Sequence, residues 1–277
     1  MSTPMPMTRG RLLALLLGVP VALGLIGWAG LTEVAYAGLG SYPVRLSVPV
    51  HGSTVNLAAG SADVQVTQAA GSTLQLAGKA TYSLVRSDVT WQTTPSGVIV
   101  SPQCHFFLGI CSFSFHAVLP TGKRVVLSDG SGNLTLRGLT GPVTGGSGSG
   151  DLQANQLSGT VSLQTGSGDI SGGTLSGPHV TLKAGSGDIA ISGLRSLDVV
   201  VSDGSGDIAL TFSKVPTRVR VSDSSGDVSV VLPRGPTRYQ VNATTDSGSR
   251  TVTVPQGGGP THTITVTDGS GNVSVTN

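Results

Sequence analysis

The stretch Asp203-Gly-Ser-Gly-Asp207, followed at once by the β-forming Ile208, decides the fold of this chain. The same phrase, or a close variant of it, recurs throughout the second half of the sequence. Its copies end at Asn133, Asp151, Asp169, Asp188, Asp207, Asp227, Ser249 and Asn272, at intervals of 18 to 23 residues. Alternating apolar residues fill these intervals. Such self-similarity predicts stacked β-units that bury a core only against their neighbours.

Each repeat predicts two short strands and two turns. In the unit Asp169 to Lys183, Ile170 starts one strand, and Val180 to Lys183 form the returning strand. We expect Gly172-Gly173 and Gly177-Pro178 to break the chain between these strands. No stretch after the N-terminal segment has apolar residues at helical spacing without Gly, Pro or β-branched residues among them. The sequence therefore predicts an all-β fold: a single elongated β-solenoid-like stack, preceded by one N-terminal transmembrane helix.

The chain divides by composition into five segments. Residues 45–120 alternate like strands but with uneven spacing, and Ala59 to Val66 match the later phrase except that Ala62 replaces a Gly. We interpret this stretch as a degenerate first unit. Repeat arrays need atypical end units, and we expect the Cys loop with Phe106, Phe107, Phe113 and Phe115 to cover one end. The segments are a cytoplasmic tail at 1–8, a transmembrane anchor or uncleaved signal at 9–31, a linker at 32–44, irregular β-units at 45–120 and regular repeats at 121–277.

An apolar run from Leu12 to Leu31 follows Arg9 and Arg11. The run is long enough to span a bilayer, and the basic residues before it predict a cytoplasmic start and an exported remainder. A cleavable signal peptide is the alternative, since Ala35-Tyr36-Ala37 has the small-x-small pattern of a cleavage site. The run is longer than the usual apolar core of a signal peptide, so we favour a retained anchor. This predicts a single-pass protein of the bacterial cytoplasmic membrane with its repeats outside.

The composition is unusual for a compact enzyme. The 277-residue chain contains 41 Gly, with 4% aromatic and 11% charged residues. Its net charge of +2 is spread thinly, and Lys123-Arg124 is its longest basic run. Nucleic acid is therefore not expected as a partner.

Cys104 and Cys111 are the only cysteines of the chain. An exported location permits a disulfide between them, and this is the interpretation that we favour. Metal binding through Cys104, His105 and Cys111 is the alternative, but no second Cys-His cluster supports it.

The Gly and the acid of each turn have separate predicted roles. The Gly suits a positive φ, and the Asp or Asn after it can accept a hydrogen bond from a nearby backbone N–H. Stacking would align Asp151, Asp169, Asp188, Asp207 and Asp227 in one column with neighbours roughly 5 Å apart. The predicted turn residues are Gly132, Asn133, Gly150, Asp151, Gly168, Asp169, Gly187, Asp188, Gly206, Asp207, Gly226, Asp227, Gly248, Gly271 and Asn272.

Calcium is the alternative for these turns. Asp203 with Asp207, and Asp223 with Asp227, place two carboxylates four residues apart in Gly- and Ser-rich loops. Against calcium, the first acid is replaced in three units, by Ser147, Thr165 and Ala184. We therefore favour a structural role for the turns and expect no cofactor.

Motifs of catalysis do not occur in the sequence. It has no HExxH, no GxxxxGK[ST], no G-x-S-x-G with a placed His, and no Glu after Glu33. The five His, at 51, 105, 116, 179 and 262, are scattered along the chain. A polysaccharide-cleaving β-helix would need carboxylates on extended loops, and units this short leave little room for them. We therefore expect a protein that is not an enzyme.

The order of these features resembles a bacterial family of candidate adhesins, of unknown function, with β-strand repeats and a toast-rack-like fold. The similarity covers about residues 42–277. It rests on the apolar run, the Cys-bracketed segment ending in Phe115 to Pro120, Val125 to Asn133, the GSGD series, and the ending from Tyr239 to Val275. The resemblance implies an envelope-exposed β-repeat body without an established reaction or catalytic residues. The chain departs from the family pattern at two positions: Ala62 replaces a turn Gly, and Ser249 replaces a turn Asp.

These observations lead to a functional hypothesis. We expect a non-enzymatic, membrane-anchored adhesin or binding scaffold whose partner is a cell-wall polymer or another envelope protein. An accessory or sensory component of an envelope-stress system is the first alternative, because some relatives of this fold are associated with such signalling. A calcium-binding or polysaccharide-acting β-helix is the second alternative.

Overall fold

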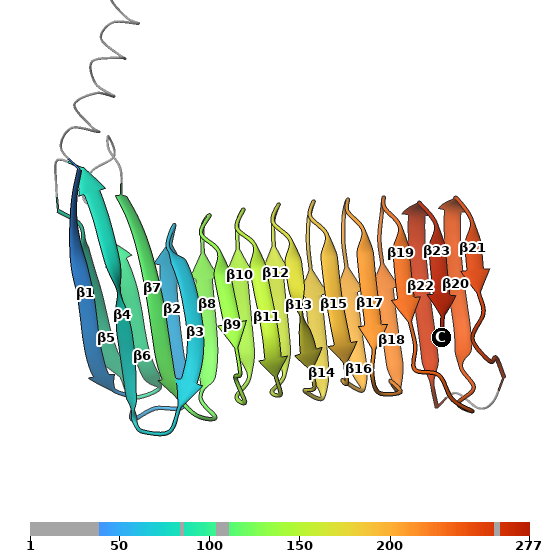
Figure 1. The fold of residues 1–277 in the computed structure, drawn as a ribbon, viewed down its shortest axis with the longest axis horizontal. Helices are drawn as coiled ribbons and strands as arrows, with labels where there is room; N and C mark the ends of the chain where they lie inside the picture. Colours follow the sequence, from blue (N-terminus) through green and yellow to red (C-terminus); the bar gives the residue numbers. More distant parts are fainter. Residues whose placement is uncertain (1–38, 84–85, 104–110, 258–260) are drawn as a thin grey trace, which may run out of the picture.

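A computed structural model describes residues 39–83, 86–103, 111–257 and 261–277. Every regular element in these ranges is a β-strand, and none of the described residues forms a helix that could cross a membrane. The predicted anchor at 9–31 lies outside the described residues and stays a prediction. The strands form an elongated stack, with β1 near one end and β20 and β21 at the other (Figure 1). The predicted all-β fold is confirmed.

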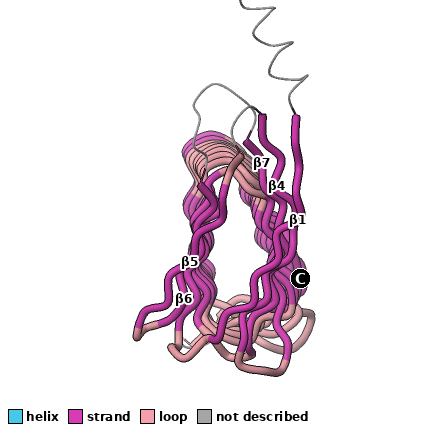
Figure 2. The backbone as a smooth tube through the Cα atoms, turned by 90° about the vertical axis from the view of Figure 1, so that its left-hand side faces the viewer, coloured by secondary structure: helices cyan, strands magenta, loops and turns pink. Residues whose placement is uncertain are grey.

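The strands belong to two sheets, which form the two walls of the stack when it is viewed along its length (Figure 2). The 12-stranded sheet has the spatial order β1 (Leu39–Pro49), β4 (Thr73–Ser83), β7 (Cys111–Pro120), β3 (Asp63–Ala69), β9 (Leu134–Arg137), β11 (Leu152–Leu157), β13 (Ile170–Leu175), β15 (Ile189–Leu194), β17 (Ile208–Phe212), β19 (Val228–Val231), β23 (Val273–Thr276) and β21 (Arg250–Val252). The 11-stranded sheet has the order β20 (Gln240–Ser247), β22 (Thr263–Ser270), β18 (Arg218–Ser222), β16 (Asp198–Ser202), β14 (His179–Lys183), β12 (Val161–Thr165), β10 (Val143–Ser147), β8 (Arg124–Asp129), β2 (Thr54–Gly60), β6 (Gly97–Gln103) and β5 (Asp88–Thr94).

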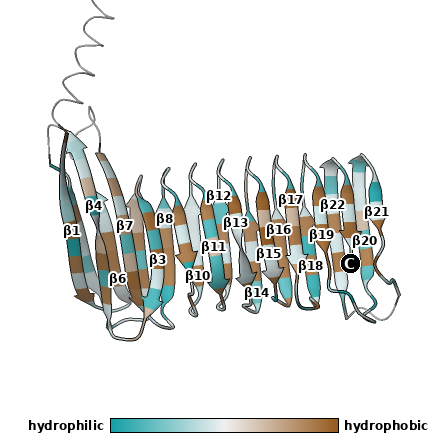
Figure 3. Cartoon of the chain, viewed as in Figure 1, coloured by the Kyte–Doolittle hydropathy of each residue, from teal (hydrophilic) through white to brown (hydrophobic). Residues whose placement is uncertain are grey.

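Parallel pairing in register places equivalent side chains of successive units above one another. Valine occupies one such interior row of the 11-stranded sheet in five neighbouring strands, and each of these side chains is at most 1% exposed: Val143, Val161, Val180, Val199 and Val219. Along many strands, apolar and polar residues alternate (Figure 3), as in β14 and β18. The apolar residues of both sheets meet in one continuous core. Because each row needs its neighbours to be buried, stability comes from contacts between layers.

The expected break at Gly172-Gly173 is wrong, because both residues lie inside β13 and pair with β11. The backbone departs from strand geometry one residue later, at Thr174, whose φ is 57°. The equivalent residues of neighbouring layers are also left-handed, with φ of 69° at Gly138, 57° at Gln156 and 66° at Gly193. This conformation interrupts the alternation of the strand, so that the leucine after it again points into the core. These leucines are Leu139, Leu157, Leu175 and Leu194, each at most 2% exposed.

The layers at both ends do not follow the order of the sequence. The first unit, β2 with β3, lies between the layer of β6 and β7 and the layer of β8 and β9. At the other end, β22 pairs with both β18 and β20, and β23 pairs with both β19 and β21. The unit of β22 and β23 is therefore an internal layer. The unit of β20 and β21, which precedes it in the sequence, forms the end of the stack.

Candidate functional site

The turns that lead from the 11-stranded to the 12-stranded sheet carry a column of outward-facing polar residues, here called the outer column. The side-chain Oδ1 of each member accepts a hydrogen bond from the backbone N–H of the next member, at 2.8 to 3.1 Å. In spatial order the members are Asp63, Asn133, Asp151, Asp169, Asp188, Asp207, Asp227, Asn272 and Ser249. The structure thus brings the predicted turn acids together and adds Asp63, which follows the degenerate Ala62.

The outer column is stabilised without a bound cation. Unit charges roughly 5 Å apart repel by about 1 kcal/mol in water, whereas a hydrogen bond to a charged group contributes about 1.5–3 kcal/mol. Each carboxylate therefore gains more from the N–H of the next layer than it loses to its neighbours. The column makes one edge of the stack negative and joins the layers through side chains as well as backbone.

The Gly before each acid is required for a different reason from the one predicted. A positive φ occurs at Gly226 (149°) and Gly248 (145°), and Gly206 at 159° is almost fully extended, but Gly187 is not in the left-handed region. Close packing between layers explains the Gly instead. A Cβ on Gly187 would lie 2.1 Å from the backbone oxygen of Gly168, and the same contact recurs along the stack at 1.8 to 2.5 Å, at Gly132, Gly150, Gly168, Gly206, Gly226, Gly248 and Gly271.

A second column, here called the inner column, lies on the interior side of the same turns. Its members end or follow the strands of the 11-stranded sheet and occupy neighbouring register positions. They are Asp129, Ser147, Thr165, Ala184, Asp203, Asp223, Asp268 and Thr245. Asp129, Asp203, Asp223 and Asp268 are at most 8% exposed. Four of the eight layers therefore place a carboxyl group at this buried position, and the other four hold a neutral side chain.

Hydroxyl side chains satisfy the inner position completely. The Thr165 Oγ1 accepts a hydrogen bond from the Gly168 N–H and donates one to the Gly150 carbonyl, both at 3.1 Å. Ser147 makes the equivalent bonds, to the Gly150 N–H at 2.8 Å and to the Gly132 carbonyl at 3.4 Å. The bond to the carbonyl oxygen requires a hydrogen-bond donor, which an ionised carboxylate lacks.

The inner carboxyl groups are only half satisfied. The Oδ1 atoms of Asp203 and Asp223 accept the N–H of the next residue at 2.7 Å, but their Oδ2 atoms are buried without a hydrogen-bond partner. Burial raises the pKa of Asp223; the Ser224 N–H partly offsets this rise, and the negative charges of Asp203 and Asp268 add to it. Burial likewise raises the pKa of Asp203 and Asp129. Burial thus makes the charged form of these groups less favourable than it is in water.

Asp223→Thr is expected to stabilise the protein at neutral pH by about 1–3 kcal/mol, because a threonine completes both hydrogen bonds and removes a buried charge. A raised folded-state pKa gives stability that is present below the ordinary value of 3.8 and is lost as the pH rises through the folded-state pKa. The difference in the free energy of unfolding between Asp223→Thr and the unchanged protein should therefore grow with pH. Urea unfolding at several pH values measures this difference. Asp227→Asn in the outer column also removes one negative charge, but from an exposed position, and it serves as the control. An equal pH-dependent gain in both variants would contradict this account.

The calcium alternative placed Asp203 with Asp207, and Asp223 with Asp227. In the structure Asp203 and Asp223 are buried members of the inner column, whereas Asp207 and Asp227 are exposed and bonded to backbone of the next layer. Within the ranges described here, no group of three or more His, Cys, Asp and Glu side chains is arranged to hold a metal ion. The two acids of one turn therefore have separate surroundings and separate partners.

A polar groove crosses the outer face of the 12-stranded sheet, where antiparallel pairing of β4 and β7 gives way to parallel pairing of β7 and β3. Its volume is about 610 Å³. Four side chains in adjacent register positions run along it, and we call them the groove row: His116, Gln65, Thr135 and Gln153. Lys79, Asp63 and Asn133 also line the groove. It offers amide, hydroxyl, imidazole and ammonium groups in one open concavity.

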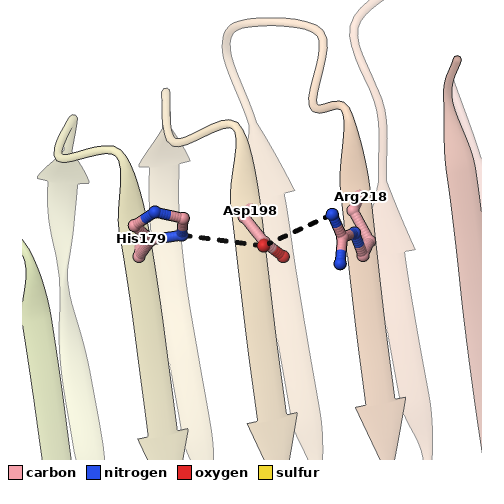
Figure 4. A network of polar contacts seen from close by, with 3 residues as sticks. All are labelled: His179, Asp198 and Arg218. Carbon is pink, nitrogen blue, oxygen red and sulfur yellow. Dashed lines mark ion pairs between the residues drawn. The ribbon is translucent and has the colours of Figure 1, made fainter.

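A small charged cluster lies on the outer face of the other sheet (Figure 4). The Asp198 Oδ2 is 3.6 Å from the His179 Nδ1 and 3.9 Å from an Arg218 guanidinium nitrogen. The three residues begin or lie at the start of β14, β16 and β18, which are neighbours in the sheet. Exposed ion pairs of this kind contribute about 0–1 kcal/mol to stability, so the cluster adds little to the stability of these layers.

One of the two cysteines of the expected disulfide lies within the described residues. Cys111 begins β7, whereas Cys104 and the Phe106 and Phe107 side chains lie outside the described residues. The bond between Cys104 and Cys111 stays a prediction. Phe113 and Phe115 are buried in the core, at 3% and 5% exposure.

In a comparison with protein families, the model described as Toastrack DUF4097 matches residues 118–277. This confirms the family resemblance inferred from the sequence. A comparison with curated proteins finds no significant match.

Several solved structures are similar to this chain. A candidate lipid binding protein from Parabacteroides distasonis ATCC 8503 is 15% identical, with 86% of this chain and 98% of that chain covered and a TM-score of 0.53. A candidate adhesin from the same organism is 13% identical, with 86% and 96% covered and a TM-score of 0.46. A candidate adhesin from Bacteroides fragilis NCTC 9343 is 12% identical, with 85% and 97% covered and a TM-score of 0.45. At these identities the similarity concerns the fold alone.

Proposed function

The chain belongs to the Toastrack DUF4097 family, and from this membership we propose that it is an adhesin-like binding scaffold, anchored in the bacterial cytoplasmic membrane and without catalytic activity. The proposal assigns binding to the outer faces of the stack. Its partner is a polymer of the cell envelope, rich in hydroxyl and amide groups.

One observation carries the proposal, namely the repetition of outward polar side chains by the parallel register. Gln65, Thr135, Gln153 and Ser171 are successive register partners on the 12-stranded sheet, so their polar ends recur at about the 4.8 Å strand spacing. The first three line the groove, which has a volume of about 610 Å³. Many weak contacts repeated along one polymer add to a useful affinity.

The non-enzymatic part of the proposal is supported by what the polar groups already do. Acids of the outer column accept backbone N–H groups of the next layer. The His116 Nε2 is 2.9 Å from the Thr67 Oγ1, and the His262 Nδ1 is 2.8 Å from the Pro216 carbonyl oxygen. These side chains hold the structure together, which is a different task from moving a proton at a reacting atom.

The binding test uses the full chain in detergent, incubated with purified peptidoglycan and then sedimented. We expect Gln65→Ala, Thr135→Ala and Gln153→Ala together to reduce the bound fraction, because they remove two amides and one hydroxyl from the groove. The matched control changes Thr144, Ser162 and Thr181 to Ala, which form an outward row on the other sheet. Equal binding by all three proteins would contradict the groove as binding site. Glycan hydrolysis that one carboxylate substitution abolishes would overturn the non-enzymatic role.

Retention of the N-terminus is the second prediction of this proposal. The run from Leu12 to Leu31 is long enough to remain in the bilayer, so the mature protein should keep its first residues and fractionate with membranes. N-terminal sequencing of the protein from cells measures this directly. A mature start at Gly38 would show that Ala35-Tyr36-Ala37 is cleaved and would remove the anchor from the proposal.

A further inference from the structure

The end of the stack formed by β1 and β5 leaves interior positions uncovered. These two strands are the last of their sheets, so among the described residues no further strand pairs with their outer edges. Trp91 of β5 pairs in register with Val100 of β6, which is only 3% exposed, and therefore occupies a core position of the repeat pattern. Its side chain is nevertheless 54% exposed. Val89, two residues earlier on the same face, packs against the core.

Trp91 belongs to a pocket of about 240 Å³ between the two terminal strands. Tyr42, Leu46 and Val89 supply apolar surface. Arg86 supplies positive charge, and Arg45, which is on the outer face of β1, also lines the pocket. The Arg86 guanidinium carbon lies 4.1 Å from the centroid of the Tyr42 ring. Asp88 is the one acidic residue among the pocket-lining residues that the structure describes, so the described pocket carries a net positive charge. The pocket thus combines exposed aromatic rings with arginines.

The opposite end of the stack is closed differently. Its last layer, β20 and β21, is bridged by Arg250, whose guanidinium donates to the Ala243 carbonyl at 3.2 Å. Tyr239 and Val254 near this layer are 1% and 5% exposed. The uncovered aromatic surface is therefore a property of the end from which the chain leads back to its N-terminus.

The sequence places this end close to the proposed anchor. The apolar run ends at Leu31 and β1 begins at Leu39. The eight residue steps between them span at most about 29 Å when fully extended. Tryptophan and tyrosine favour the boundary between water and hydrocarbon, and arginine pairs with phosphate.

We propose that the pocket between β1 and β5 docks on the membrane surface and takes phospholipid headgroups, with Trp91 at the level of the glycerol backbone and Arg45 and Arg86 at the phosphates. This inference rests on the proposed membrane anchor. A second copy of the chain is the weaker occupant, because it would bring two arginine pairs together. Docking holds the stack at a defined orientation beside the bilayer.

Fluorescence of Trp91 in the full chain tests the proposal. Trp28 and Trp91 are the only tryptophans, so Trp28→Phe leaves one reporter. The protein is reconstituted in vesicles of phosphatidylcholine and phosphatidylglycerol, with or without brominated lipid. We expect brominated lipid to cause a loss of Trp91 fluorescence, and Arg45→Glu with Arg86→Glu to reduce that loss.

The control carries Trp28→Phe, Trp91→Phe and Gln92→Trp. It moves the reporter by one residue to the opposite face of β5, where brominated lipid should have little effect. If Trp91 is not quenched although the protein sediments with the vesicles, the docking proposal is contradicted and the anchor proposal is not. Fluorescence that changes with protein density but not with brominated lipid would assign the pocket to a second copy instead. Protein that leaves the vesicles would overturn the anchor, and the docking proposal with it.

Discussion

Gly187→Val is expected to lower the free energy of unfolding by more than about 3 kcal/mol, which places it among the most damaging single substitutions. The added Cβ would lie 2.1 Å from the Gly168 carbonyl oxygen and 2.6 Å from its carbon. These are backbone atoms of the adjacent layer, held by the sheet on both sides, so they cannot move away as a side chain could. Urea unfolding followed by circular dichroism measures the loss.

Two matched variants separate this steric effect from other effects in the same turn. Asp188→Asn keeps the oxygen that accepts the Asp207 N–H and should cost less than about 1 kcal/mol. Gly185→Ser should cost less than Gly187→Val, because Ser224 already occupies the equivalent position two layers further along the stack. Equal losses for Gly187→Val and Asp188→Asn would show that close packing between layers does not explain the turn glycine.

Deletion of residues 261–277 is expected to abolish the cooperative unfolding transition of the C-terminal half of the stack. The strands lost, β22 and β23, lie inside the stack, so their removal leaves β20 and β21 without a neighbour in either sheet. Interior residues such as Val219 and Val228 would then be uncovered. Limited proteolysis should cut the variant rapidly between residues 232 and 257.

The control for this deletion removes residues 152–169, one whole unit of similar length. Asp151 then joins Ile170, and β9 can pair with β13 in the register that β11 had. The result is a stack that is shorter by one layer but has both ends intact, so its unfolding should remain cooperative. If the C-terminal deletion is tolerated as well as the internal one, the last unit does not support its neighbours in the way that the pairing indicates.

The repeat phrase was sufficient to predict the fold class and the outer column, because both follow from a regular period and local turn chemistry. The inner column also had a signal in the sequence. Val219, Val221 and Asp223 alternate, so Asp223 must share the interior face of the two valines. The replacement of that acid by Ser147 or Thr165 served only as an argument against calcium, although it marks a position that needs a hydroxyl donor.

Other features could not be predicted from a single repeat. The need for Gly187 depends on an atom of the preceding layer, and the left-handed row at Gln156 and Thr174 contains residues without a preference for that conformation. The period also does not identify which unit packs on which. Self-similar units are equally suited to pair with any other unit, so the displaced order at both ends comes from the irregular strands β4 to β7 and β20 to β21. The groove arises at one of these irregular boundaries.

The interleaved ends have a consequence for biogenesis. Synthesis proceeds from the N-terminus, so β20 and β21 leave the ribosome before the strands that will hold them in the sheets. Until Thr263 to Thr276 follow, these strands have unpaired edges, which is a state prone to wrong association. The stack therefore cannot mature by adding one finished layer after another. Its assembly includes a late insertion, because β22 must enter between β18 and β20, and β23 between β19 and β21, after those strands have been made.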